Sequence, residues 1–271
     1  MAEKNSPLIN ARNHDLAGLT IRRVLPFASG ETVLRNVGPF VFLDHMGPIE
    51  TKTPLFVPEH PHIGLATATY LFEGEILHRD SLGSEQVIRP GELNLMTAGR
   101  WITHLEQGLS QRLHGLQFWL ALPTPHEQCD PSFQHVGQEG LPEWETSSTN
   151  WQLLMGSHGE RQSQAVFPAR VLFLSGATTE RGENLSLSVN EDEAAIYLAS
   201  GSASIDGREL QAGQLLRLST RTEQSLSVEA RSQFAIFGGD VLDGPRLMRW
   251  NYVATTKELI AAAEDRWSRE S

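Results

Sequence analysis

The chain has 271 residues and a formal net charge of −11, from 22 basic and 33 acidic side chains. This length allows two ordinary domains with sizeable cores, and the negative charge disfavours direct binding to nucleic-acid phosphates or anionic membrane surfaces. The single cysteine, Cys129, excludes an intramolecular disulfide and fits a reducing compartment.

The N-terminal sequence MAEKNSPLINARNHDLAG contains neither the apolar core of a signal peptide nor a lipidation pattern. No run in the chain approaches the length of a membrane span, so we expect a cytoplasmic protein without a membrane partner. Extended patterns follow at residues 19–25 and 32–34. Gly38-Pro39 then turns the chain into an apolar run over residues 40–46, which predicts a buried strand.

Residues 60–107 carry a metal-ligand type of spacing at each end, as His60-Pro61-His62 and His104-Leu105-Glu106. In a β-strand, side chains two positions apart point to the same face, so each pair can present two ligand atoms to one point. Three imidazoles and one carboxylate suit Fe, Mn, Ni, Cu or Zn, and leave two positions of an octahedral ion open. Either pair alone also occurs as ordinary hydrogen-bonded side chains.

Short strands and glycine turns alternate between the two pairs, with extended segments at residues 65–72 and 76–80 and no helical period. This rhythm predicts an antiparallel barrel or jelly roll, with the two pairs facing each other across its lumen. His78 lies at a strand end beside a turn and is interpreted as exposed or locally hydrogen-bonded. His114 is expected to line the cavity without binding metal.

Residues 126–144 are polar and punctuated by proline, which indicates a linker with a domain boundary near residue 135. We therefore predict one domain over residues 1–135 and a second over residues 136–271. The second half repeats the strand-and-turn pattern, and AAIYLASGSASIDGRELQAGQLLRLS resembles the central segment of the first half, as an internal duplication would leave it. Because this half holds no histidine pair at ligand spacing, its barrel has lost the ligands.

The C-terminal residues change period and predict one helix. Thr255-Thr256-Lys257-Glu258 has the form of a capping box, and Leu259, Ile260, Ala263 and Trp267 then recur on one face. We expect this apolar stripe to dock on a barrel, with Trp267 as the anchor; the alternative is a helix that binds a partner.

The first half resembles the pirin family, a branch of the cupin superfamily. The matching segments are GPFVFLDHMGP, HPH, TYLFEGEILHRDSLG, IRPGE, MTAGR and LHGLQFWLALP. The resemblance implies an all-β bicupin, with two tandem jelly-roll barrels, a C-terminal helix packed across both, and one metal site. Residue by residue, the family's ligands fall on His60, His62, His104 and Glu106, with Fe(II) as the expected ion and Mn, Ni, Cu or Zn as alternatives. The same context gives His45 a structural or orienting role.

Departures from the family pattern lie close to the site. Ile63 and Ala66 stand where many members carry Arg and Glu, which removes charge behind the histidine pair. Trp101 stands where members commonly have Gly, and Leu105 replaces a small polar residue. A large aromatic side chain at position 101 either narrows the cavity mouth or packs under a loop.

Two functions follow from the resemblance. In the first, the chain is a metal-dependent dioxygenase similar to quercetin 2,3-dioxygenases, acting on a small flavonol-like chelating substrate, with Glu106 also serving as the base that removes the substrate proton. In the second, the metal is structural or redox-sensing and the protein regulates a protein partner. The complete ligand set favours the first function, whereas a cavity narrowed by Trp101 favours the second.

Overall fold

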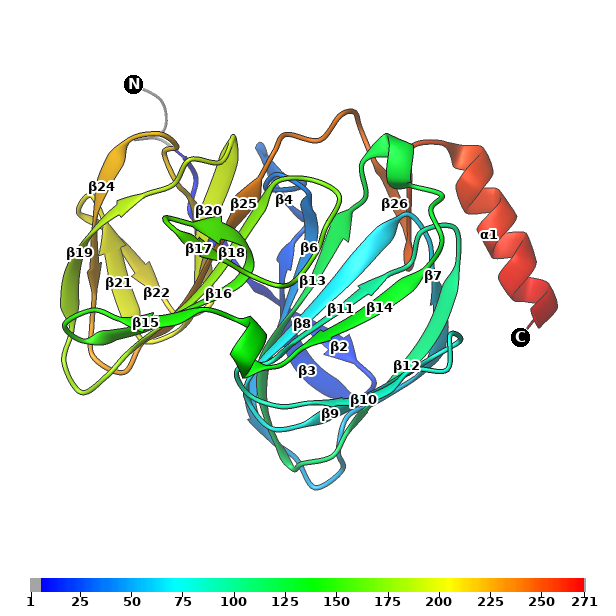
Figure 1. Cartoon of the computed structure of the whole chain (residues 1–271), viewed down its shortest axis with the longest axis horizontal. Coiled ribbons are helices and arrows are strands. Elements are labelled where there is room, and N and C mark those ends of the chain that lie inside the picture. Colours follow the sequence, from blue (N-terminus) through cyan, green and yellow to red (C-terminus); the bar gives the residue numbers. More distant parts are fainter. Residues whose placement is uncertain (1–5, 271) are drawn as a thin grey trace. The chain divides into compact units, whose positions relative to one another are not determined.

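The structure is a computed structural model that describes residues 6–270. The described chain divides into two compact units (Figure 1). The first barrel comprises residues 14–21, 42–137 and 242–270, and the second barrel comprises residues 6–13, 22–41 and 138–241. None of the described helices is both long and apolar enough to cross a membrane.

The first barrel is built from a seven-stranded sheet, in the order β14-β11-β8-β13-β6-β3-β2, and a four-stranded sheet, in the order β10-β9-β12-β7. Their bounds are β2 (Arg12–Leu16), β3 (Leu19–Leu25), β6 (Phe40–Glu50), β7 (Phe56–His62), β8 (Leu65–Glu73), β9 (Ile76–Asp80), β10 (Glu85–Ile88), β11 (Leu93–Thr97), β12 (Ile102–Gly108), β13 (Arg112–Ala121) and β14 (Ser132–Val136). Buried apolar side chains from both sheets, among them Met46, Leu71, Ile76 and Ile88, pack in one cluster. The interior between the sheets is therefore the core of this barrel.

The second barrel repeats this plan with sheets ordered β1-β23-β20-β25-β18-β16-β15 and β19-β24-β21-β22, and with β17 paired to β16. Their bounds are β1 (Ile9–Asn10), β15 (Glu143–Glu145), β16 (Thr149–His158), β17 (Arg161–Gln162), β18 (Val171–Thr178), β19 (Glu183–Ser188), β20 (Glu193–Ser200), β21 (Ser202–Ile205), β22 (Arg208–Gln211), β23 (Gln214–Arg217), β24 (Glu223–Val228) and β25 (Gln233–Gly239). Strands β19 and β24 take the places of β7 and β12. Their buried side chains include Leu187, Leu226 and Val228, which join a continuous apolar core.

Shorter elements complete the described chain. They are β4 (Phe27–Ser29) paired with β5 (Thr32–Leu34), β26 (Leu247–Arg249) paired with β27 (Tyr252–Ala254), the 3-10 helices η1 (Thr124–His126) and η2 (Gln138–Gly140), and helix α1 (Lys257–Glu270). The predicted all-β fold of two cupin barrels with a C-terminal helix is confirmed.

The chain crosses between the barrels more than once, which a single boundary near residue 135 does not describe. Strand β1 near the N-terminus pairs with β23 of the second barrel. Helix α1, assigned from sequence to the second domain, packs on Ile63, Trp101 and Tyr252 of the first barrel. The segment interpreted as a linker also contains a strand, β14, which pairs antiparallel with β11.

The N-cap of helix α1 is Thr256, one residue later than the N-cap of the predicted capping box. The backbone N–H of Leu259 donates to Thr256 Oγ1 at 3.3 Å, which makes Thr256 the N-cap. Thr255 instead donates its hydroxyl to Glu127 Oε2 at 2.7 Å. The predicted apolar stripe is confirmed, because Ile260 and Ala263 are buried while Leu259 and Trp267 are partly buried against the same cluster.

Candidate metal centre

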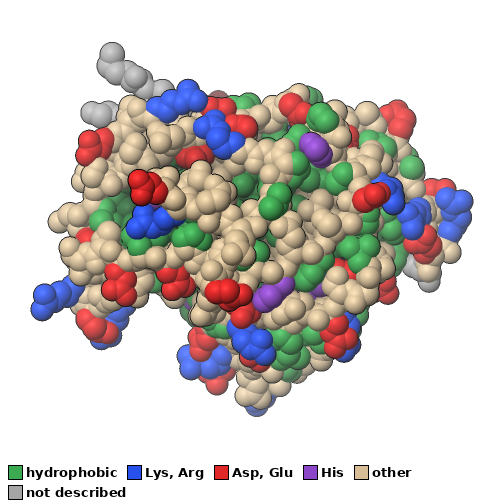
Figure 2. Space-filling view, viewed as in Figure 1, with side chains coloured by type: hydrophobic (Ala, Val, Ile, Leu, Met, Phe, Trp, Pro, Cys, Tyr) green, Lys and Arg blue, Asp and Glu red, His purple; other side chains and the backbone are tan. Residues whose placement is uncertain are grey.

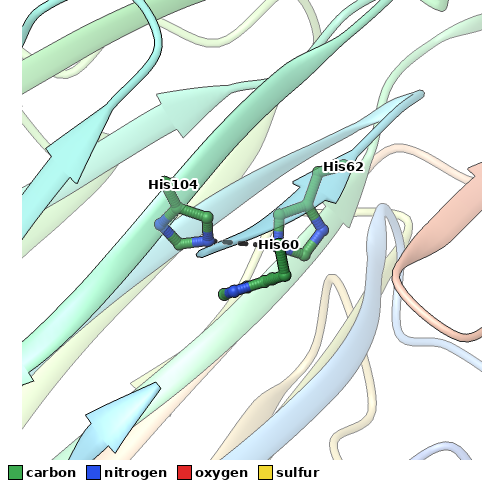
Figure 3. Close-up of side chains that lie close together, drawn as sticks. All are labelled: His60, His62 and His104. Atoms are coloured by element: carbon green, nitrogen blue, oxygen red, sulfur yellow. Dashed lines mark hydrogen bonds between the residues drawn. The ribbon is translucent and has the colours of Figure 1, made fainter. Parts of the chain in front are cut away.

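Strands β7 and β12 bring three of the predicted ligands together on one face of the four-stranded sheet. The strands are antiparallel, with His104 opposite His60 and Ile102 opposite His62. The rings of His60, His62 and His104 turn toward one another, and their ligand atoms lie within 4.8 Å (Figure 3). His62 and His104 are buried, whereas His60 is partly exposed. The group therefore lies in the barrel interior, with His60 on its accessible side.

Backbone carbonyls fix the proton positions of the first two histidines. His60 Nδ1 lies 2.8 Å from the carbonyl of Pro58, and His62 Nδ1 lies 2.9 Å from the carbonyl of Asn251. A carbonyl only accepts hydrogen bonds, so each Nδ1 carries the proton and donates it. In both neutral rings the lone pair is left on Nε2, which faces the centre of the group.

His104 is fixed by side chains instead. Its Nδ1 lies 3.3 Å from His78 Nδ1, and His78 Nε2 lies 3.1 Å from Asp80 Oδ2. The Asp80 carboxylate accepts from His78 Nε2, which leaves the lone pair of neutral His78 on Nδ1. His104 therefore donates its own proton from Nδ1, and its Nε2 also presents a lone pair to the centre.

These proton positions test whether the residues fit a metal ion. His62 Nε2 and His104 Nε2 are 3.1 Å apart (Figure 3), and the hydrogen bonds described above leave neither nitrogen with a proton to share. Metal–nitrogen bonds of about 2.1 Å that meet near a right angle place two ring nitrogens about 3 Å apart. Three converging lone pairs with this spacing are a donor set for a divalent cation.

Burial keeps these imidazoles in the form that binds metal. Desolvation lowers the pKa of His60 and lowers the pKa values of His62 and His104 well below the usual value of 6.5. Each ring is therefore neutral near pH 7, and a metal ion does not have to displace a proton from Nε2.

The fourth predicted ligand, Glu106, lies on the other side of His104. Its carboxylate groups with His104 and His78, not with His60 and His62, so His104 is common to two sets of ligand-type atoms. The pairing of β12 with β7 shifts register between His104 and Glu106, which changes the direction of the second pair. Burial raises the pKa of Glu106 to about 7.

Several groups around the site were not identified from the sequence. His78, interpreted as exposed or locally hydrogen-bonded, is hydrogen-bonded but buried. The carbonyl of Asn251 reaches His62 across 189 positions of sequence, and no local pattern marks it. Gly64 allows this close approach, because at its φ of +67° a Cβ would lie 2.0 Å from the carbonyl oxygen of Val253.

Trp101 does not narrow the cavity. It points to the opposite face of the sheet from His104, since the two residues are three positions apart on an extended segment. Its indole is buried in a cluster with Ile63, Tyr252 and helix α1, and the Arg266 guanidinium lies 4.3 Å from its ring centroid. The interpretation of Trp101 as a packing residue is the one that holds, although it packs under a helix and not a loop.

Aromatic side chains border the metal-ligand group on the other side. Trp119 contacts the His62 ring edge to face at 5.2 Å and stacks on Phe42 with ring centroids 4.0 Å apart. His45 and His114 form a separate buried pair, with their Nε2 atoms 2.9 Å apart. Neither belongs to the ligand-type groups found among the described residues.

Comparison with known proteins identifies the family. Residues 18–120 match the Pirin family model, and residues 174–271 match the model for the Pirin C-terminal cupin domain. The chain belongs to the pirin family. A pirin-like protein from Caulobacter vibrioides is 42% identical to this chain. The alignment covers 96% of this chain and 92% of that protein.

Solved structures agree with this assignment. A quercetin 2,3-dioxygenase from Acinetobacter baumannii superposes with a TM-score of 0.90 at 32% identity, over 98% of this pirin and 89% of that chain. A bacterial pirin from Escherichia coli, solved in complex with nickel(II), shares the fold with a TM-score of 0.67 at 19% identity, over 87% of this chain and 99% of that one. That Escherichia coli pirin was solved with nickel(II), and the histidine group is a candidate metal site in this chain.

Proposed function

We propose that this pirin is a metal-dependent dioxygenase that acts on a flavonol-like chelating substrate. The observation that carries the proposal is the convergence of three Nε2 lone pairs, from His60, His62 and His104, inside the first barrel. The similarity to a quercetin 2,3-dioxygenase over almost the whole chain supports the substrate class. Fe(II) is the proposed ion, with Mn, Ni, Cu or Zn as alternatives.

The three histidines would hold the ion. Glu106 is the proposed base, and its carboxylate would have to turn from His78 toward His60 and His62 to serve as the fourth ligand. When bound, the metal supplies open positions for a chelating substrate and oxygen. As a buried carboxyl group beside the histidines, Glu106 is the proposed acceptor of a proton from a substrate hydroxyl. Trp119 and Phe42 form a stacked aromatic pair beside His62, and this pair is the proposed apolar border of the substrate site.

The alternative, a regulator that acts through a protein partner, loses the observation that favoured it. That argument depended on Trp101 narrowing the cavity, and Trp101 lies under helix α1 instead.

Metal analysis and oxygen uptake test the proposal together. We expect about one metal ion per chain, and oxygen uptake on addition of a flavonol to the metal-loaded protein. The double variant His60→Ala, His104→Ala should bind no metal and show no oxygen uptake. Glu106→Gln should lower oxygen uptake by a larger factor than it lowers metal content. Bound metal with no uptake across a panel of flavonols would contradict the dioxygenase and support the regulator; metal retained in the double variant would contradict the site.

A further inference from the structure

Asp80 and His78 form a chain of hydrogen bonds that ends on the buried nitrogen of a proposed metal ligand. The chain runs from the Asp80 carboxylate to His78 Nε2 at 3.1 Å, and from His78 Nδ1 to His104 Nδ1 at 3.3 Å. We propose that Asp80 and His78 are positioning residues that hold the proton of His104 on Nδ1 and so keep its Nε2 free for metal. This inference rests on the proposed metal site and adds two residues to it.

Asp80, at one end of this series of hydrogen bonds, is held in place by the backbone. Asp80 Oδ1 accepts from the backbone N–H groups of Leu82 and Ser84, at 2.9 and 3.0 Å, in the turn between β9 and β10. Only Oδ2 is directed at His78, and the Asp80 side chain is fully buried. The two oxygens therefore have separate partners, and the turn decides which one faces the histidine.

His78, the middle residue of this series of hydrogen bonds, is held in place by stacking. The His78 ring lies on Phe133 of β14, with centroids 4.4 Å apart and planes 12° from parallel. It also borders His104, at a centroid distance of 5.1 Å. With its plane set by Phe133 and one nitrogen bonded to Asp80, His78 has only Nδ1 left to offer, and this atom faces His104 as an acceptor.

Replacing Asp80 by Asn moves the ring proton of His78 and the ring proton of His104 to the other nitrogen. The N–H groups of Leu82 and Ser84 still require an acceptor, so the amide oxygen takes the Oδ1 position and the amide NH2 faces His78. An NH2 group only donates, so His78 must accept at Nε2 and carry its proton on Nδ1. His104 then accepts at Nδ1 and carries its proton on Nε2, where it points at the metal position.

The test uses the full-length protein with nickel(II) as the probe. In the metal-free wild type, 15N NMR of labelled histidine should show His104 protonated on Nδ1; in Asp80→Asn it should show protonation on Nε2. Nickel affinity, measured by competition with a chelator, should fall roughly 10- to 100-fold in Asp80→Asn, as is typical when a partner of a metal ligand is lost. A merely structural role for Asp80 would lower thermal stability without moving the His104 proton.

Two further variants make the test decisive. His78→Phe keeps a ring against Phe133 but removes both nitrogens, and should weaken nickel binding to a similar extent. Arg79→Ala is the matched control, because Arg79 lies between the two positioning residues but pairs with exposed Glu85; its affinity should equal that of the wild type.

The outcomes separate this inference from the proposed function. Wild type that binds no nickel would refute the metal site, and the NMR measurement would still report on the hydrogen-bond chain in the metal-free protein. Wild type that binds nickel, beside an Asp80→Asn variant with unchanged affinity and unchanged His104 protonation, would overturn the positioning role alone.

Discussion

At the scale of single residues, sequence spacing identified the three histidines of the candidate metal site but not the groups that orient them. A histidine pair two positions apart on a strand shows a shared face directly, because strand geometry has a period of two. The partners of those rings are a carbonyl at Asn251, a carbonyl at Pro58 and the side chain of His78. Backbone carbonyls occur at every position, so no residue type could have marked them.

The packing of Trp101 gives a first prediction. Because its indole is 8% exposed in the cluster beneath helix α1, Trp101→Gly should lower the free energy of unfolding by about 3–5 kcal/mol. It should not raise turnover of bulky substrates, since no volume is added to the metal cavity. Urea unfolding measures the first effect, with Trp250→Ala as the control because Trp250 is 55% exposed. Faster turnover in Trp101→Gly would show that the indole does restrict access.

Glu106 gives a prediction about pH in the metal-free protein. Burial raises its pKa from 4.5 to about 7. Between these two pH values the Glu106 carboxyl is protonated in the folded state and ionised in the unfolded state. The stability from protonated Glu106 is fully present below about pH 4.5 and is lost as pH rises through about 7, up to about 3 kcal/mol.

Comparison with Glu106→Gln isolates this contribution, because the buried histidines titrate alike in both proteins. Urea unfolding of the two metal-free proteins between about pH 5 and about pH 8 should show the wild type losing stability relative to the variant as pH rises. Parallel curves over this range would mean that the pKa of Glu106 is not raised.

At the scale of elements, strands with strong apolar patterns were predicted well and polar edge strands were not. β3, β5 and β9 have the bounds expected from sequence. The polar residues Ser132, Gln134 and His135 give β14 the pattern of a linker, yet this strand completes the edge of the sheet by pairing with β11. The backbone hydrogen bonds of an edge strand leave little trace in the side chains, which are half in solvent.

The start of helix α1 gives a prediction that tests Thr256 as the N-cap. Thr256→Ala removes the acceptor for the Leu259 N–H and should cost about 1 kcal/mol of stability. Ser268→Ala, at the exposed far end of the helix where the hydroxyl donates to the Asp265 carbonyl, should cost less than about 0.5 kcal/mol. Thermal unfolding distinguishes them, and equal losses would place the N-cap elsewhere.

At the scale of the whole molecule, the two barrels share one strand order but differ in what fills the interior. Leu187, Leu226 and Val228 on β19 and β24 are buried in an apolar core, whereas β7 and β12 carry the histidines. The sequence predicted this loss of ligands from the missing histidine pair. It did not predict that the N-terminal strand belongs to the second barrel and the C-terminal helix to the first. Strand pairing over some 200 positions, as between Ile9 and Leu215, leaves no periodic signal in the sequence.

Charge over the whole chain gives the last prediction. Acidic and basic side chains are interspersed over the viewed face, without a continuous basic band among the residues described (Figure 2), and the net charge is −11. Counterion release drives non-specific binding to duplex DNA only where basic side chains meet successive phosphates. We expect no gel shift with duplex DNA at physiological salt, with the protein either metal-free or metal-loaded. Tight binding whose affinity falls steeply as salt is raised would contradict this and would require a basic surface formed on the opposite face.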